Sequence, residues 1–206
     1  MNIAKPVLSY ILEATTPNKS SRPILEYAYY LSNTKKLVAT DAFRLHEVEI
    51  DLWDEDFCID KQGNKQPVQW KFPDYNKFFP DTSIPTLPMQ VDLKVLKQMP
   101  SLCKPISHHT ILSLANGSLR TMQSSTPSDF TTYDIRMKPF TFPQPNDNRN
   151  EQDIGINVEY LYQALRYSDS PHSLKYQSKN ALVPFIIHHT IWYCIARTLI
   201  MPLKLS

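Results

Sequence analysis

KLVATDAFRLHE, at Lys36–Glu47, combines two apolar runs around a polar corner. The first run reaches the Thr40-Asp41 corner, and the chain leaves it through Arg44–His46. This pattern predicts two strands joined by a tight bend. Asp41 suits the bend because its short carboxylate can accept hydrogen bonds from backbone N–H groups just beyond it. Many β-hairpins share this pattern, so it gains weight only from the rest of the chain.

Two further stretches complete an ordered set of motifs. They are KFPDYNKFFP at Lys71–Pro80 and RTLIMPLKLS at Arg197–Ser206. The three stretches resemble motifs of the bacterial sliding clamp, the beta subunit of DNA polymerase III, whose members carry an ATDGHRL-like corner, an FPDY-like linker and an MPMRL-like tail. The resemblance covers most of the chain and is strongest from about Lys71 onward. It implies an α+β DNA-clamp fold of repeated strand-helix-three-strand units, with antiparallel sheets outside and helices on one face.

Length and composition set the broad class. The chain has 206 residues, 42% of them hydrophobic, which suffices for one large or two small cores. Its apolar runs fall far short of the ~20 residues needed to cross a membrane, and no signal-peptide pattern opens it. Cys58, Cys103 and Cys194 are odd in number and form no CxxC pair. We therefore expect reduced thiols, two of them in the core, in a cytoplasmic protein without membrane contact.

The charge balance does not by itself indicate nucleic-acid binding. The 22 basic and 20 acidic residues give a net charge of +2, whereas tight DNA binding usually needs a concentrated basic face. Any DNA contact is therefore expected to be loose. Glycine is scarce (3) and proline abundant (17), which favours short strands with fixed corners and disfavours a glycine-rich phosphate loop.

The first half of the chain predicts one helix and several strands. Apolar residues spaced by three and four predict a helix over Lys5–Thr16, ended by Pro17. Aromatic and aliphatic residues predict a strand over Pro23–Leu31, before the two strands of the corner. A hairpin is expected from Phe57–Ile59 and Val68–Trp70. Asp51–Asp56 is rich in acidic residues and is expected to form a solvated loop.

The second half opens with a proline-punctuated linker. A helix follows, with Leu93, Leu96 and Leu102 on one side, and Pro100 should limit its first part to about two turns. The Asn116-Gly117 pair predicts a tight hairpin. The two strands of this hairpin are expected at Thr110–Leu114 and Leu119–Gln123. A third strand is expected at Phe130–Phe140, followed by a mobile loop at Pro143–Gln152.

The last segment predicts a further strand-helix-three-strand unit. After a strand at Ile154–Ile156, Asn157 can cap a helix over Val158–Tyr167. We expect Leu161, Ala164 and Leu165 to face inward. The closing strands are Ser173–Gln177, Leu182–Ile187 and Thr190–Met201.

The order strand, helix, three strands is thus expected once before the linker and twice after it. Only 24 residues separate Glu47 from Phe72, which leaves no room for the second helix that clamp relatives have there. We predict a shortened clamp-like domain over 1–80 that resembles the middle clamp domain, a linker over 81–90 and a clamp-like C-terminal domain over 91–206.

The resemblance implies a hydrophobic groove that binds short peptide motifs of partner proteins. Exposed methionine and leucine would give an adaptable floor, with Arg44 and Lys204 supplying charge at the rim. Alternatively, these residues seal a domain interface. The matching positions are Leu25, Thr40, Ala42, Arg44, Leu45, Pro73, Lys77, Phe78, Ile200, Met201, Pro202, Leu203 and Lys204.

The chain departs from the clamp motifs at several positions. Ala42-Phe43 replaces Gly-His, Lys204 replaces an arginine, and Ser206 extends the tail. Phe43 could fill part of the groove. Lys204 cannot form the planar fork of an arginine, so partner preference is expected to differ.

A second expected surface is the DNA-facing one, because clamp rings line their hole with basic helices. The candidates are Lys5, Lys94, Lys97, Lys104 and Arg166. A solvated helix face is the alternative. Each lysine would contribute little alone, and binding would depend strongly on salt.

The sequence gives little support for catalysis, a metal or a cofactor. His108-His109 and His188-His189 are adjacent pairs on expected strands, where neighbouring side chains point to opposite faces and cannot chelate one ion together. No nearby base is identifiable for a cysteine nucleophile. No Walker, Rossmann or serine-nucleophile motif occurs.

These observations predict a non-enzymatic processivity factor that encircles duplex DNA as a homo-oligomer. It would tether a DNA polymerase or another protein with a clamp-binding motif, and could require a clamp loader. The alternative is a clamp-derived interaction module, such as a decoy, inhibitor or adaptor, that does not encircle DNA.

Overall fold

The computed structural model describes residues 3–16, 21–79, 86–103, 109–114, 117–121, 136–142, 153–171, 174–177 and 183–203. In the first half, the elements are α1 (Lys5–Leu12), the 3-10 helix η1 (Pro23–Glu26), β1 (Ala28–Leu31), β2 (Lys36–Thr40), β3 (Arg44–Glu49), β4 (Phe57–Ile59), β5 (Lys65–Gln66) and the 3-10 helix η2 (Asn76–Phe78). In the second half, they are β6 (Leu87–Val91), α2 (Leu93–Cys103), β7 (His109–Ser113), β8 (Leu119–Thr121), β9 (Arg136–Met137), β10 (Phe140–Thr141), β11 (Asp153–Asn157), α3 (Val158–Leu165), β12 (Leu174–Gln177), β13 (Phe185–Ile191) and β14 (Cys194–Ile200).

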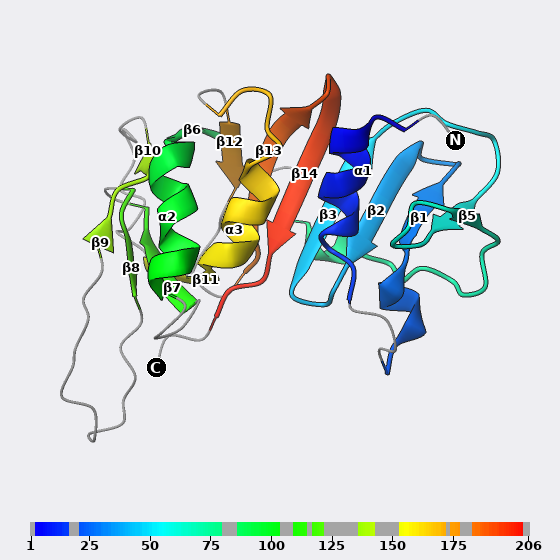
Figure 1. Ribbon diagram of the computed structural model, residues 1–206, viewed down its shortest axis with the longest axis horizontal. Helices are drawn as coiled ribbons and strands as arrows, with labels where there is room; N and C mark the ends of the chain where they lie inside the picture. Colours follow the sequence, from blue (N-terminus) through cyan, green and yellow to red (C-terminus); the bar gives the residue numbers. More distant parts are fainter. Residues whose placement is uncertain are drawn as a thin grey trace.

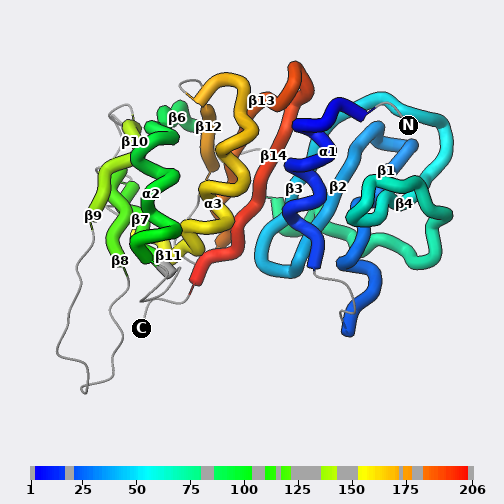
Figure 2. Tube along the Cα trace, in the orientation of Figure 1, coloured from blue at the N-terminus to red at the C-terminus, as the bar shows by residue number. Residues whose placement is uncertain are grey.

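One ten-stranded sheet runs through the molecule, in the order β10-β6-β12-β13-β14-β3-β2-β1-β4-β5. The helices α2, α3 and α1 lie side by side along one face of it (Figures 1 and 2). A four-stranded sheet, β11-β7-β8-β9, belongs to the second half alone. Helices on one face of an antiparallel sheet are the arrangement that the sequence predicted.

The sheet joins the two ends of the chain. Strand β14 pairs antiparallel with β3, so that Ile200 lies opposite Arg44 and Ala196 lies opposite Val48. The corner after β2 and the last residues of the chain are therefore neighbours. Their convergence, predicted from the motifs, is confirmed.

Strand β2 is buried on both of its faces. Leu37 and Ala39 pack with Val7 and other residues of α1 in one core, while Val38 belongs to a separate cluster on the opposite face. This alternation follows from the period of two in a strand. We call the face with Val38 the outer face and the other one the helix face.

The second half encloses a core between α2, α3 and both of its sheets. Leu161, Ala164 and Leu165 are fully buried, as predicted. The Asn157 side chain accepts a hydrogen bond from the Glu159 backbone N–H at 2.9 Å, which confirms the predicted cap. Cys58 and Cys103 are buried and Cys194 is half-buried, in line with the expectation for the thiols.

In the first half, α1 is the single α-helix among the described residues. The stretch after β3 forms β4 and β5 and no second helix, as its length predicted. The predicted strand Val68–Trp70 is wrong, because β5 lies earlier. The Asp60 carboxylate accepts hydrogen bonds from the Gln62 and Asn64 backbone N–H groups and closes the hairpin there.

Other expected boundaries also shift. Residues 23–26 form η1 before β1, and residues 87–90 of the expected linker form most of β6. The third strand expected in the second half is two short strands, β9 and β10, in different sheets. The helices α1 and α3 end at Leu12 and Leu165, and β13 extends through Thr190 to Ile191. The expected mobile loop lies outside the described residues.

Helix α2 differs most from its prediction, since it continues through Pro100 to Cys103. Pro100 lies near the end of the helix, where its missing N–H costs one intrahelical hydrogen bond at most. Leu96, Met99 and Cys103 form the buried stripe, at spacings of three and four. Leu102 lies off this stripe and is 44% exposed, contrary to expectation.

Candidate partner-binding groove

Local hydrogen bonds fix the corner between β2 and β3. Asp41 Oδ1 accepts from the backbone N–H groups of Phe43 and Arg44, both at 3.0 Å, as its residue type predicted. Thr40 Oγ1 accepts from the Ala42 N–H and donates to the Arg44 carbonyl. Ala42 has a φ of +78°, a left-handed conformation that favours glycine. Phe43, next to it, is 61% exposed.

Arg44 is buried, so its predicted role as a rim charge is wrong. Its guanidinium binds the Asp41 carboxylate, the Gln163 side chain and the Glu13 carbonyl. It also lies 4.3 Å from the ring centre of Tyr160. Because these partners come from the corner, from α3 and from the residue that follows α1, Arg44 joins the first half of the molecule to the second.

The tail continues β14 past the corner. The Met201 N–H donates to the Phe43 carbonyl at 2.8 Å, and the Leu203 N–H donates to the Gly155 carbonyl. Ile200, one of the predicted groove positions, is fully buried in the core of the second half, so a partner cannot reach it there. Leu199, which the prediction missed, lies on the outer face with Met201. Strand alternation counted back from Met201 would have identified it.

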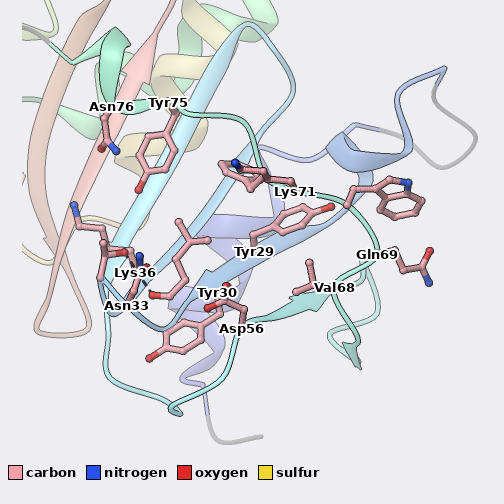
Figure 3. Close-up of a pocket in the computed structure, with 14 residues that line it drawn as sticks. Tyr29, Tyr30, Asn33, Lys36, Asp56, Val68, Gln69, Lys71, Tyr75 and Asn76 are labelled. Atoms are coloured by element: carbon pink, nitrogen blue, oxygen red, sulfur yellow. Dashed lines mark hydrogen bonds between the residues drawn. The ribbon is translucent and has the colours of Figure 1, made fainter.

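Residues 71–79, here called the crossing segment, pass over the outer face of four adjacent strands from β1 to β14. Part of its course is visible in Figure 3. Three of its aromatic side chains contact the sheet. The ring centres of Phe72 and Tyr29 are 4.7 Å apart, and the Tyr75 hydroxyl donates a hydrogen bond to the Glu47 carboxylate at 2.7 Å. The Arg197 guanidinium lies 4.1 Å from the ring centre of Phe79.

Corner, crossing segment and tail meet in one apolar cluster on the outer face. Its members from these three parts include Leu45, Phe72, Tyr75, Leu199 and Met201. The parts that the three motifs encode are thus brought together.

The other predicted groove residues lie at different depths. Pro73, Lys77, Phe78 and Ala42 are exposed, Thr40, Met201, Pro202 and Leu203 are half-buried, and Leu45 and Leu25 are buried. Leu25 lies on η1 and not on the expected strand. Lys204 lies outside the described residues.

The predicted DNA-facing residues lie on or beside the helices. Lys5, Lys94 and Lys97 are exposed. Arg166 forms an ion pair with Glu13 and contacts the Tyr167 hydroxyl, so its charge is partly compensated. Lys104 lies outside the described residues. Two of the three exposed candidates, Lys94 and Lys97, therefore belong to α2.

A buried polar cluster, which the sequence did not predict, lies between α1 and the helix face of the sheet. The Tyr10 ring stacks on His46 with centres 4.2 Å apart and meets the His189 ring edge-on at 5.3 Å. The Tyr10 hydroxyl is 2.8 Å from Thr198 Oγ1. Burial lowers the pKa of His46 well below its usual value and lowers the pKa of His189 to about 3.

Neither a metal centre nor a membrane span is found in the part of the chain that the structure describes. No three His, Cys, Asp or Glu side chains there are grouped to hold a metal ion, and no helix there is long and apolar enough to cross a membrane. His188 contacts Gln177, whereas its neighbour His189 lies in the buried cluster, as expected for adjacent residues of a strand.

Comparison with solved structures identifies the fold. The chain superimposes on the Helicobacter pylori beta clamp in complex with diflunisal with a TM-score of 0.69 and 16% identity, covering 97% of this chain and 64% of that chain. For a Pseudomonas aeruginosa DNA polymerase sliding clamp with ligand, the TM-score is 0.71 at 18% identity, covering 98% and 65%. For the Thermotoga maritima DNA polymerase III beta subunit, it is 0.70 at 15% identity, covering 98% and 63%.

The chain spans less than two thirds of the length of these clamps. One Pseudomonas aeruginosa clamp is bound to griselimycin, so that relative binds a ligand. No protein-family model and no curated protein matches the sequence. The likeness in structure nevertheless extends over nearly all of this chain, and we conclude that it has the fold of the bacterial DNA polymerase III beta sliding clamp over the part of the clamp that it covers.

Proposed function

We propose that this protein is a sliding-clamp-like processivity factor that encircles duplex DNA as an oligomer and tethers partners through a groove on its outer face. The observation that carries the proposal is the division of the molecule into two faces. The helices with their exposed lysines lie on one face of the sheet, and the corner, crossing segment and tail meet on the other. A ring needs that division, since DNA and partner must bind at the same time.

The groove has the chemistry of a peptide site. Leu45 and Leu199 form a buried apolar base, and half-buried Met201 can adapt its side chain to different partners. Phe43 and Phe78 are 61% and 44% exposed, which is unusual for phenylalanine and typical of aromatic anchors at interfaces. The partner would be a short, mainly apolar motif of a polymerase or another client.

The helix face would hold DNA loosely. Lys5, Lys94 and Lys97 can reach phosphates from one face, but their number is small and the Arg166 charge is partly offset by Glu13. Such contacts carry no sequence information, and salt weakens them strongly. Loose contact is compatible with sliding, and a clamp loader could be needed to open the ring.

In the proposed ring, several copies of this chain close around the DNA. Clamp rings of the family that the sequence resembles close from six two-helix domains. Three copies would supply six domains if each half of this chain counts as one. Four copies would instead supply as many helices as six two-helix domains contain, because each chain has three α-helices among its described residues.

Two measurements test the proposal. Size-exclusion chromatography with light scattering should give a closed oligomer at micromolar concentration, and a strict monomer would remove the ring.

A short polymerase-tail peptide should bind, and Met201→Ala should weaken the binding of this peptide about tenfold because less apolar surface is buried. Ile195→Ala, at an exposed residue of β14, is the matched control and should leave binding unchanged. Equal binding by both variants would exclude the groove.

The second candidate function is a clamp-derived interaction module, such as a decoy, inhibitor or adaptor, that does not encircle DNA. The composition of the first half favours this candidate. Its described residues include one α-helix and form no second sheet, whereas the second half has two α-helices and a second sheet. Retention on circular DNA, with release after linearisation, would support the ring. Peptide binding by a monomer that circular DNA does not retain would support the module.

A further inference from the structure

A cavity of about 570 Å³ lies on the outer face, on the other side of the crossing segment from the proposed groove. Figure 3 shows its lining side chains, which come from β1, the turn between β1 and β2, Lys36 at the start of β2, Asp56 before β4, residues 68–72, and Tyr75 and Asn76. It shares no lining residue with the groove positions predicted from the sequence, although Phe72 and Tyr75 of the crossing segment also belong to the outer-face apolar cluster. Its size falls within the usual range for ligand pockets.

Aromatic side chains form most of its apolar surface. Tyr29, Phe72 and Tyr75 are at most 9% exposed and form the floor. Val68 and Trp70 stand at the rim and are 42% and 37% exposed. An aromatic ring inserted here would meet ring faces and edges, a contact that stabilises beyond the burial of its apolar area.

The floor also carries a polar group without a partner. The Tyr29 hydroxyl is buried and has no hydrogen-bond partner among the described residues, and the Cys58 thiol beside it is at best a weak one. Burial raises the pKa of Tyr29, so the hydroxyl keeps its proton and can donate it. A buried donor of this kind favours a ligand that brings an acceptor.

The charges around the cavity favour an anionic acceptor. Lys71 is exposed and has no ion pair among the described residues, while Asp56, the acidic residue of the lining, already accepts from the backbone N–H and hydroxyl of Ser32. The remaining carboxylates of the neighbouring acidic loop are paired: Asp51 and Asp54 with Lys35, and Glu55 with Lys65. Of the two lysines in the lining, Lys36 is paired with Glu47, so Lys71 is the one whose charge no described carboxylate pairs, and the lining holds two lysines against the single carboxylate of Asp56.

We propose that this cavity binds an aromatic side chain and an adjacent carboxylate from a segment of a partner protein. The ring packs on Tyr29 and Phe72 below Trp70, and the carboxylate accepts from the Tyr29 hydroxyl and pairs with Lys71. The open rim formed by residues 68–71 suits an extended segment. A nucleic-acid strand fits less well, because its successive phosphates would need several unpaired lysines, and Lys71 is the one that this lining supplies. The site is separate from the proposed groove and does not depend on it.

The test uses the indole N–H signals of Trp53, Trp70 and Trp192 in nitrogen-15 NMR spectra of the full chain, assigned by single Trp→Phe variants. The probes are two end-blocked tetrapeptides, Gly-Asp-Phe-Gly and its neutral match Gly-Asn-Phe-Gly. The acidic peptide should shift the Trp70 signal and leave that of Trp192 unchanged. It should bind about tenfold more tightly than the neutral one, as expected for a charge-assisted hydrogen bond.

Variants locate the effect. Tyr29→Phe keeps the ring and removes the donor, and Lys71→Ala removes the charge, so each should reduce the preference for the acidic peptide severalfold. Lys77→Ala and Met201→Ala, at the groove, should leave the titration unchanged, which separates this site from the proposed function. The proposal is overturned by an unshifted Trp70 signal at about 10 mM peptide, by equal affinity for both peptides, or by a shift with an oligothymidine strand alone.

Discussion

The Arg197 guanidinium binds the Glu47 carboxylate across the boundary between β14 and β3, with Nε 2.8 Å from Oε1. Glu47 is only 1% exposed, and it also accepts from the Tyr75 hydroxyl and lies 3.3 Å from Lys36 Nζ. The two residues are 150 positions apart. This ion pair therefore joins the first half of the chain, the tail strand and the crossing segment at one point of the outer face.

Removal of the arginine should lower the stability of the whole protein. Arg197→Met keeps much of the packing but leaves the buried Glu47 charge with fewer partners. We expect a loss of about 2–4 kcal/mol in the free energy of unfolding, measured by urea denaturation. Lys35→Ala breaks exposed ion pairs and should cost less than about 1 kcal/mol. Similar losses for the two variants would argue against a buried junction.

Acid should destabilise the protein through the buried histidines. Burial is the largest cause of the lowered pKa of both His46 and His189, followed by the charge of Arg44 for His46 and by His188 for His189. The unfolded chain, with a pKa near 6.5 for each imidazole, binds protons that the folded state excludes. The contribution of the two neutral histidines to the free energy of unfolding is complete above about pH 7 and is lost progressively below pH 6.5. By pH 5 it has fallen by about 2 kcal/mol per histidine.

A His189→Phe variant isolates this effect from the carboxylates. Its free energy of unfolding, measured by denaturant titration between pH 7 and pH 5, should lose less on acidification than that of the unchanged protein, by about 2 kcal/mol. Parallel curves for the two proteins would show that His189 is not the origin of the acid sensitivity.

The corner should become more stable with glycine. Ala42 holds a φ of +78°, which strains an L-residue by about 1–2 kcal/mol, whereas glycine adopts it freely at a smaller entropic cost. Ala42→Gly should therefore raise the free energy of unfolding by about 0.5–1 kcal/mol, readable as a higher melting temperature. Ala28→Gly, in the buried strand β1, should lower it. A destabilised Ala42→Gly variant would contradict the geometry of the corner.

Charge reversal on α2 should weaken DNA binding if the helix face meets DNA. Lys94→Glu with Lys97→Glu should reduce the affinity for duplex DNA and lower the salt slope of log K by about one for each phosphate that is no longer neutralised. Lys175→Glu changes the charge of a lysine on β12, on the face away from the helices. Fluorescence anisotropy over a salt series separates the two, and a loss in binding free energy with Lys175→Glu about half that of the double variant would indicate only a net-charge effect.

Local chemistry determined the parts of the fold that the sequence predicted. Asp41 and Asn157 accept hydrogen bonds from backbone groups within three residues of themselves, so their roles do not depend on the rest of the molecule. The buried positions of α3 follow from helical spacing in the same way. The sequence alone also carried the three motifs and their order, and hence the clamp-like fold.

Interactions between distant segments decided what the sequence did not predict. Arg44 is buried because α1 and α3 bring Glu13 and Gln163 to it, and local spacing gave no sign of those partners. Helix α2 continues through Pro100 because its buried face packs into the core of the second half. The cavity beside Tyr29 exists because the crossing segment lies over β1. Such features depend on three-dimensional packing between residues far apart in the chain, whereas hydrogen bonds and spacing within a few residues can be read directly from the sequence.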